Sequence, residues 1–345
     1  MLTVVIIGVL VALLFDFLNG MSDAANSIAT IVATRVLSPA AAVTWAAFWN
    51  FAAVFVFGVS VANTMGKGIV DASLVNEYLI LAALIGAVIW VWVCTHYGLP
   101  ISVSHSLIGG LIGPVWFTYG TSGLIAKGII KIAAFIVLSP LIGMILGFFM
   151  MCLVMVIFKR TSPFKVDKLF KGMQLFSSAI FSLGHGSNDA QKTMGIIALL
   201  LFSVAGSNDF IGQYLFDAEK GFHVPYWLVI TCYSVIALGT LAGGWRVIKT
   251  LGDDLTKLKP VHGFCAETAG ALTLIGTSLG GIPISTTHTI TGSIIGVSMT
   301  RGLASVRWAT ASNIVVAWIC TIPATLVISG ICYLLMRFFI TIPAS

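Results

Sequence analysis

Long apolar stretches, separated by short polar segments, make up almost the whole chain. A helix that crosses a hydrocarbon core of about 30 Å needs about 20 apolar residues. Gly20 is a candidate break in the first apolar stretch. Pro140 interrupts the apolar stretch at 123–158, which is therefore either one kinked span or two shorter helices. The predicted helical segments are residues 1–35, 40–62, 79–97, 123–158, 172–205 and 226–245. This pattern predicts an all-α polytopic membrane protein.

Two Ser- and Gly-rich segments of similar sequence interrupt the apolar pattern. GLPISVSHSLIGGLIG begins at Gly98 and GIPISTTHTITGSIIG begins at Gly281, so the two align at an offset of 183, with His105 opposite His288. Irregular backbone at membrane depth is tolerated only where it lines a cavity inside the protein. We therefore expect broken helices here, with irregular backbone from about residue 101 to 113 in the first copy.

A polar face recurs on two of the predicted helices. The stretches FDFLNGMSDAANSIAT and FSLGHGSNDAQKTMG align on Gly20 and Gly186. In each, four side chains spaced 0, 3, 7 and 10 residues apart share one face of an α-helix. The first face consists of Asp16, Asn19, Asp23 and Asn26, and the second of Ser182, His185, Asp189 and Lys192. Two motif pairs in the same order indicate an internal duplication.

Basic residues indicate how the two halves are oriented. The loop at 246–262 carries four Lys or Arg residues, whereas its counterpart at 63–79 carries one. Corresponding loops that differ in this way, one rich and one poor in Lys and Arg, lie on opposite sides of a membrane. We therefore expect two inverted-topology repeats with broken helices, an architecture that transporters use to place substrate at the midplane. The expected parts are a first repeat at 1–158, a short basic cytoplasmic loop at 159–171 and a second repeat at 172–345, with both termini outside.

Composition excludes most other classes of protein. Of 345 residues, 58% are hydrophobic and 9% charged, and the mean hydropathy is +1.05, which excludes a soluble fold. The net charge of +6 follows from cytoplasmic loops and does not indicate nucleic-acid binding. No short leader with a cleavage site is apparent, so we expect a multi-pass protein of the inner or plasma membrane. The six cysteines stand singly and suggest neither a metal site nor disulfides.

The two polar faces are candidates for a cation site. An Asp inside a membrane costs about 2.5–3.5 kcal/mol, so Asp16, Asp23 and Asp189 should face a cavity, a cation or each other. Carboxylate and amide oxygens suit a hard monovalent cation, and a carboxylate also suits a proton carrier. The structural alternative is a buried ion pair in which Lys192 holds Asp189 or Asp23. We favour a site because three aspartates exceed one lysine.

The broken segments have the character of an oxyanion site. Hydroxyl groups and the free N–H groups at a helix start bind anions, and the absence of Arg suits a transporter that must release its anion. The alternative is ordinary packing of small side chains at helix crossings. The candidate hydroxyl donors are Ser102, Ser104, Ser106, Ser285, Thr286, Thr287 and Thr289.

Several polar residues have either a coupling or a structural role. His105 and His288 are each a hydrogen-bonded brace or a proton carrier. Glu267 has no carboxylate opposite it in the first half, and is either a gating or relay group or a side chain that reaches the interface. The same two readings apply to Asp16, Asn19, His185 and Lys192. We expect no enzyme, since the chain lacks H-E-x-x-H, G-x-S-x-G and P-loop motifs.

Three motifs resemble the inorganic phosphate transporters of the PiT family. They are N-G-M-S-D-A-A-N-S, H-G-S-N-D-A-Q-K and the two P-I-S-x-[ST]-H segments. The resemblance implies a secondary active symporter that imports inorganic phosphate with Na⁺ or H⁺ by alternating access. It also implies a homodimer in the lipid bilayer, about 10–12 membrane segments per chain, and no cofactor apart from the co-transported cation. The short middle loop suggests a prokaryotic member.

The same resemblance assigns the site residues. It implies that cation coordination, including Na⁺ as the metal if sodium is coupled, falls to Asp23, Asn26, Asn188 and Asp189. It implies that the phosphate is surrounded by Gln191, Ser104, Ser106, Thr286 and Thr287. Four alternatives stay open at this point: a sulfate symporter, a symporter of a metal–phosphate complex, a passive anion channel and a nutrient-sensing receptor.

Overall fold

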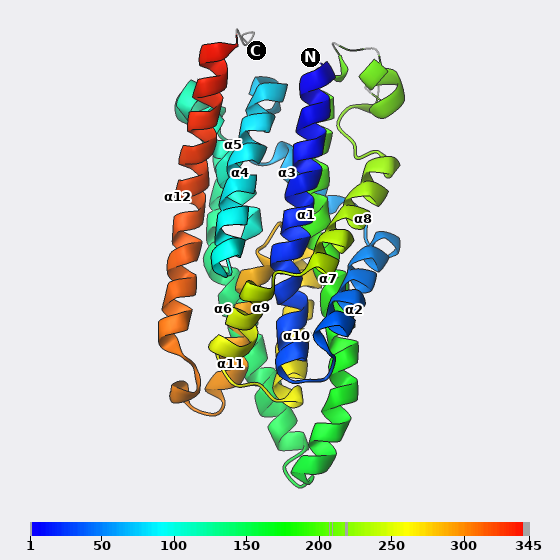
Figure 1. The fold of residues 1–345 in the computed structure, drawn as a ribbon, viewed down its shortest axis with the longest axis vertical. Helices are drawn as coiled ribbons and strands as arrows, with labels where there is room; N and C mark the ends of the chain where they lie inside the picture. The colour runs from blue at the N-terminus through cyan, green and yellow to red at the C-terminus, as the bar shows by residue number, and fades with distance from the viewer. Residues whose placement is uncertain (1, 207, 209, 218–219, 341–345) are drawn as a thin grey trace.

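Helices account for nearly all of the computed structural model, which describes residues 2–206, 208, 210–217 and 220–340 (Figure 1). Within these ranges extended backbone pairs only at an isolated bridge between Val70 and Leu124. Four described helices are long and apolar enough to cross a membrane, and two bent helix pairs raise the number to six. The all-α prediction is confirmed, and the protein is a multi-pass membrane protein. The count of 10–12 segments remains a prediction.

The described part of the first half contains six α-helices. Short 3₁₀ turns follow α2, α3 and α5 at Ala53–Phe55, Ala72–Leu74 and Gly120–Gly123. The helices are α1 (Leu2–Ala33), α2 (Pro39–Ala52), α3 (Ser60–Lys67), α4 (Glu77–Tyr97), α5 (Val103–Tyr119) and α6 (Ala126–Ile157).

The second half repeats this order. Its helices are α7 (Pro163–Ala205), α8 (Tyr226–Ala242), α9 (Trp245–Lys249), α10 (Pro260–Leu279), α11 (Thr286–Met299) and α12 (Trp308–Phe339). Turns of π-helix lie at Ile211–Leu215 and Thr250–Asp254, and a 3₁₀ turn lies at Leu303–Ser305. Helices α10 and α11 begin 183 residues after α4 and α5, and Pro323 inside α12 keeps the same offset from Pro140 inside α6. This correspondence agrees with a duplication, while the inverted orientation of the halves remains a proposal.

Each half contains one sharply bent helix pair. The pair that starts with α2 bends by 86° before α3, and the pair formed by α8 and α9 bends by 67°. The span predicted at 40–62 is therefore interrupted by a bend between α2 and α3, and the segment 246–262 is partly helical instead of a loop. Gly243 and Gly244 explain the second bend, because Gly243 has a φ of 68°, which side chains disfavour.

Helix α1 runs unbroken through Gly20, so the expected break there does not occur. The glycine serves close packing instead: a Cβ at Gly20 would lie 2.2 Å from the carbonyl oxygen of Ile236 in α8. Its counterpart Gly186 in α7 has the same role, since a Cβ there would lie 2.5 Å from the carbonyl oxygen of Asn50 in α2. Each polar-face helix thus packs closely on the bent pair of the other half.

The basic segment 159–171 is mostly helical, which corrects the prediction of a loop. Helix α7 starts at Pro163 after the N-cap Ser162, and proline at the first position favours a helix start. Lys165, Lys168 and Lys171 therefore lie on α7. The turn between α6 and α7 lies at the end of the molecule opposite to the start of α1 and the end of α12 (Figure 1). The side of the membrane that each end faces stays a prediction. Pro140 does not split α6.

Within the two similar Ser- and Gly-rich segments, irregular backbone is confined to residues 98–102 and 280–285, shorter than expected, because α5 and α11 start directly afterwards. Gly98 and Gly281 open these breaks with φ values of 70° and 61°. The hydroxyl of Thr250 donates to the carbonyl of Gly98 (2.9 Å), and that of Thr64 donates to the carbonyl of Gly281 (2.8 Å). The bent pair of each half therefore holds the break of the other half.

Replacing Gly20 with Ala should lower the thermal unfolding temperature of the detergent-solubilised protein, because the added Cβ pushes α1 away from backbone atoms of α8. Gly276→Ala in α10 is the matched control, since nothing lies within 4 Å of its Cβ position. Gly→Ala inside a helix stabilises by roughly 0.5–1 kcal/mol when space allows. Equal unfolding temperatures for the two variants would contradict the close packing at Gly20.

Candidate functional site

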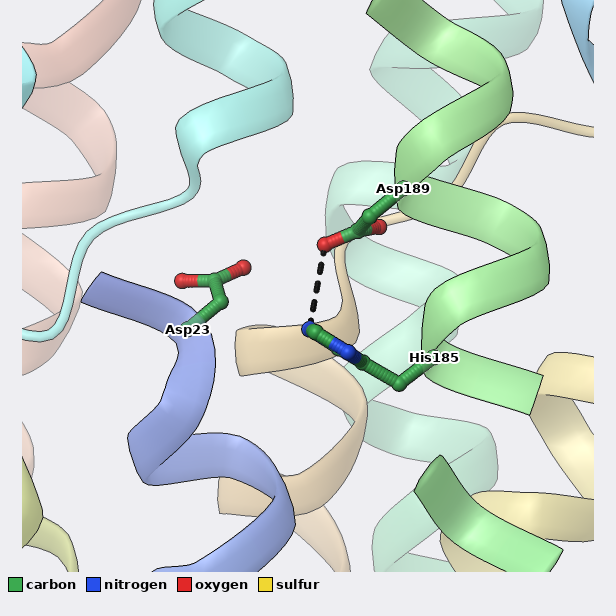
Figure 2. A group of neighbouring side chains, drawn as sticks. All are labelled: Asp23, His185 and Asp189. Atoms are coloured by element: carbon green, nitrogen blue, oxygen red, sulfur yellow. Dashed lines mark ion pairs between the residues drawn. The ribbon is translucent and has the colours of Figure 1, made fainter. Parts of the chain in front are cut away.

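The two polar faces meet at a buried centre between α1, α7 and the first residues of α5 and α11. Figure 2 shows Asp23 on α1 pointing toward Asp189 and His185 on α7. Ligand atoms of these three side chains lie within 4.8 Å of one another. None of the three is more than 3% exposed, so the centre is closed to both sides of the membrane.

Asp23 and Asn26 on α1 bind the start of α11. The Asn26 amide nitrogen donates to the hydroxyls of Thr286 (3.1 Å) and Thr287 (3.0 Å). Those hydroxyls in turn lie 3.1 Å and 3.4 Å from the two carboxylate oxygens of Asp23. A side-chain pair of the first half is thereby joined to the broken segment of the second half.

Asp189 on α7 has two basic neighbours on its own helix. The Lys192 ammonium lies 2.6 Å from one carboxylate oxygen, and the His185 Nε2 lies 3.3 Å from the other, the contact drawn in Figure 2. Lys192 also donates to the hydroxyl of Ser104 (2.5 Å) and to the carbonyl of Ile284 (2.7 Å). The buried ion pair considered from the sequence therefore exists for Asp189, while among the described residues no ion pair joins Asp23 to Lys192.

The hydroxyl of Thr286 lies between the two aspartates, 3.1 Å from Asp23 and 3.3 Å from Asp189. A hydroxyl has one proton and can donate to only one of these carboxylate oxygens. The other oxygen then faces the Thr286 oxygen without a proton between them, which is repulsive. A cation or an added proton at this point removes the conflict.

Two amide oxygens are candidate ligands of the expected kind. The Oδ1 atoms of Asn26 and Asn188 are buried and have no hydrogen-bond partner among the described residues. The nitrogen of Asn188 is already engaged, since it donates to the hydroxyl of Ser278 at 3.1 Å. A buried carbonyl without a partner is unfavourable. The donor set of carboxylate and amide oxygens therefore fits a hard monovalent cation.

The predicted hydroxyl donors fall into two groups. Ser104, Thr286 and Thr287 belong to the centre just described. Ser102 and Ser285 are instead the N-caps of α5 and α11, where their hydroxyl oxygens accept from the backbone N–H groups of His105 and His288 at 3.2 Å. The hydroxyls of Ser106 and Thr289 donate back to the carbonyls of Ser102 (3.3 Å) and Ser285 (2.9 Å).

Within the described residues, the side chain of Gln191 makes no hydrogen bond to the Ser and Thr hydroxyl groups that the family resemblance places with it around the phosphate. Its side-chain oxygen accepts from the backbone N–H groups of Val61 (2.9 Å) and Ala62 (3.4 Å), at the start of α3. Its nitrogen donates to the hydroxyl of Ser187 at 3.2 Å. Gln191 thus satisfies orphan donors at a helix start.

The two equivalent histidines touch each other. The ring centroids of His105 and His288 are 4.8 Å apart, and His288 stacks on Trp318 at 3.7 Å. His288 Nδ1 lies 3.3 Å from the carbonyl of Ile136, while His105 Nδ1 and His288 Nε2 have no partner among the described residues. The packed rings agree with a brace, and the free nitrogens leave room for a second role.

The remaining carboxylates lie in separate polar clusters. Asp16 accepts a hydrogen bond from Thr193 at 2.8 Å, and the amide oxygen of Asn19 is buried without a partner among the described residues. Glu267 accepts from Thr30 (2.6 Å), from the Gln174 amide (3.0 Å) and from Ser177. Glu267 is 0% exposed, so it does not reach the interface.

Sequence reasoning missed Asn50, which positions His185. Its side-chain oxygen lies 3.2 Å from His185 Nδ1, and its nitrogen donates to Thr240 at 2.9 Å. A signal was present, because Asn50 is a lone amide inside the apolar run at 40–62. The carbonyl of Ile284 gave no signal, since a backbone ligand depends on the fold alone.

Long apolar helices around a closed, charged centre define the protein as a polytopic membrane transport protein. Residues 19–329 match the phosphate transporter family. A probable low-affinity inorganic phosphate transporter of Rhizobium meliloti (strain 1021) is 53% identical, with 94% of this chain and 93% of the relative covered. One from Bacillus subtilis (strain 168) is 37% identical over 98% of both chains. The chain belongs to the phosphate transporter family, which confirms the resemblance and the prediction that it is no enzyme.

A solved structure gives the same result at the level of the fold. A sodium-dependent phosphate transporter matches with a TM-score of 0.88 and 26% identity, over 98% of this chain and 100% of the other. The chain is similar to that protein along nearly its whole length.

Replacing Ser285 with Ala should lower the free energy of unfolding by about 1 kcal/mol, because α11 loses its N-cap. Ser285→Asn should keep the stability, since the Asn side chain accepts from the same backbone N–H. Thermal unfolding of both purified variants tests the role. If Ser285→Ala unfolds like the wild type and only raises the phosphate KM, Ser285 is a substrate ligand and not a cap.

Proposed function

We propose that this protein is a secondary active symporter that imports inorganic phosphate together with a cation. The shared hydroxyl of Thr286 between Asp23 and Asp189 carries the proposal. Two carboxylates and one Lys ammonium leave an excess negative charge in a site closed to water, and burying such a charge is costly. A co-bound Na⁺ or H⁺ at Asp23 balances it, with Asn26 and Asn188 supplying amide oxygens if the cation is Na⁺.

The phosphate binds beside this cation, at the starts of α5 and α11. These starts lie close together, because Lys192 contacts both Ser104 and the carbonyl of Ile284. Helix N-termini favour anions, and the hydroxyls of Ser104, Thr286 and Thr287 add donors. We keep Ser102, Ser106, Ser285 and Gln191 in the proposed substrate site as groups that shape it.

Phosphate is favoured over sulfate by the acceptors in this centre. Near neutral pH phosphate still carries at least one O–H, which donates to a carboxylate such as Asp23 or Asp189, whereas sulfate carries none. A site built to hydrogen-bond a substrate hydroxyl strongly rejects an analogue that lacks it. The carboxylates therefore serve selectivity as well as cation binding.

The closed state supports a mechanism of alternating access. Cation and anion each reduce the charge that the other meets, so each favours binding of the other. The breaks before α5 and α11 are held by Thr250 and Thr64 from the bent pairs, and a movement of either bent pair carries the break with it. The two inverted repeats, the homodimer and the inner-membrane location belong to this proposal.

Phosphate uptake into proteoliposomes tests the function directly. Labelled phosphate is supplied outside with either an inward Na⁺ gradient or an inward H⁺ gradient. The neighbouring structure is named a sodium-dependent phosphate transporter, so we expect Na⁺ to drive uptake. Stimulation by H⁺ alone would make the carboxylates proton carriers. Flux that ignores both gradients would indicate a channel, and competition by equimolar sulfate would indicate a broader anion transporter.

Asp23→Asn should abolish gradient-driven uptake and leave the unfolding temperature nearly unchanged, because the amide keeps the hydrogen bonds to Thr286 and Thr287 but removes the charge that binds the cation. Asp71→Asn, in an exposed loop, is the matched control and should transport normally. Uptake by Asp23→Asn at the wild-type rate would refute the role of Asp23.

A further inference from the structure

The two polar faces differ at three of their four positions, and the last of these differences places a charge beside the shared aspartate. Aligned on their glycines, Asp23 stands opposite Asp189, and Asn26 stands opposite Lys192. A neutral amide in the first half therefore corresponds to an ammonium in the second. The contacts correspond too: Asn26 donates to Thr287, and Lys192 donates to Ser104, which aligns with Thr287.

Lys192 is bound like an ion in a ligand cage. Its nitrogen has three oxygen neighbours at 2.5, 2.6 and 2.7 Å, namely Ser104, Asp189 and the carbonyl of Ile284. An ammonium has three donors, so all of them are used. Lys192 is 1% exposed, and among the described side chains it is the only buried Lys or Arg. Carboxylate, hydroxyl and carbonyl oxygens are the ligands that a monovalent cation takes as well.

We propose that the Lys192 ammonium is a tethered cation that occupies the second of two equivalent cation positions, so that the protein moves one cation fewer per phosphate than two open positions would require. The first position, formed by Asp23, Asn26 and the hydroxyls of Thr286 and Thr287, stays open to a mobile cation. This inference rests on the proposed symport and specifies its stoichiometry.

Charge balance gives the physical reason. Asp23 and Asp189 together place two negative charges in a buried site, and uncompensated charge at membrane depth is costly. Lys192 compensates Asp189 in every state of the transport cycle, because it cannot dissociate. A single mobile cation then balances Asp23. Without the ammonium, Asp189 requires a second mobile cation before the loaded site can close.

The test counts the cations carried with each phosphate. The wild-type protein and Lys192→Asn, which copies the first-half residue into the second half, are reconstituted in proteoliposomes. The cation gradient that stops net phosphate flux is measured at a fixed phosphate gradient, with the membrane potential clamped at zero. We expect one cation per phosphate for the wild type and one more for the variant. The cation dependence of uptake should become steeper in the variant, with maximal uptake regained at high cation concentration.

Controls separate this proposal from other roles of Lys192. Lys131→Asn, at an exposed position of α6, should leave the count unchanged. The reciprocal variant Asn26→Lys places an ammonium in the open position, and its phosphate flux should no longer respond to the cation gradient. This second variant keeps the proposal testable if Lys192→Asn does not fold, as judged by thermal unfolding.

Three results would overturn the proposal: a wild-type count of two or more, an unchanged count in Lys192→Asn, or a folded Lys192→Asn protein that is inactive at every cation concentration. A raised phosphate KM with an unchanged count would make Lys192 a phosphate ligand instead. Failure of the wild type to transport phosphate under any gradient would contradict the symporter itself, and is thus distinguishable from failure of the tethered-cation proposal.

Discussion

Two carboxylates are buried at membrane depth, and the surrounding structure must compensate their charge. Asp23 and Asp189 lie in a centre closed to water, where each charged oxygen needs a donor, a cation or a proton. Lys192 and His185 serve Asp189, while Thr286 stands between the two aspartates and can donate to only one. The charge of the centre is therefore balanced only by a further positive charge, which is the physical basis of the cation coupling that we propose.

Contacts between the two halves of the chain form this centre. Neither polar-face helix packs mainly within its own half: Gly20 brings α1 against α8, and Gly186 brings α7 against α2. The side chains follow the same rule, since Asn26 on α1 binds Thr287 of the second half and Lys192 on α7 binds Ser104 of the first. Movement of one half against the other consequently acts on every ligand of the site.

Some predictions made from short stretches of sequence were wrong, because helix packing or helix capping determined the local structure instead. Gly20 was expected to break a helix, but a glycine costs a helix only about 1 kcal/mol and close contact with α8 compensates for it. The basic segment after Lys159 was expected to be a loop, because its charge was considered without the start signal of Ser162 and Pro163. The backbone partners of Gln191 were also not expected, because its side chain caps α3, a short helix whose start was hidden inside the apolar run at 40–62. The place of Gln191 in the phosphate site stays a prediction.

The sequence by itself determined the membrane class, the twin motifs and the residues of the charged centre, because hydropathy and helical spacing are properties of short stretches of chain. Only the tertiary structure decided which aspartate Lys192 neutralises, that Asn50 positions His185 and that the carbonyl of Ile284 is a ligand. The contacts of Asn50 and Ile284 join residues that are about 90 to 135 positions apart in the sequence. Lys192 and Asp189 are close in sequence, but the sequence left open whether Lys192 pairs with Asp189 or with Asp23. Spacing along a helix says nothing about which distant backbone or side chain lies opposite, since packing between helices sets that.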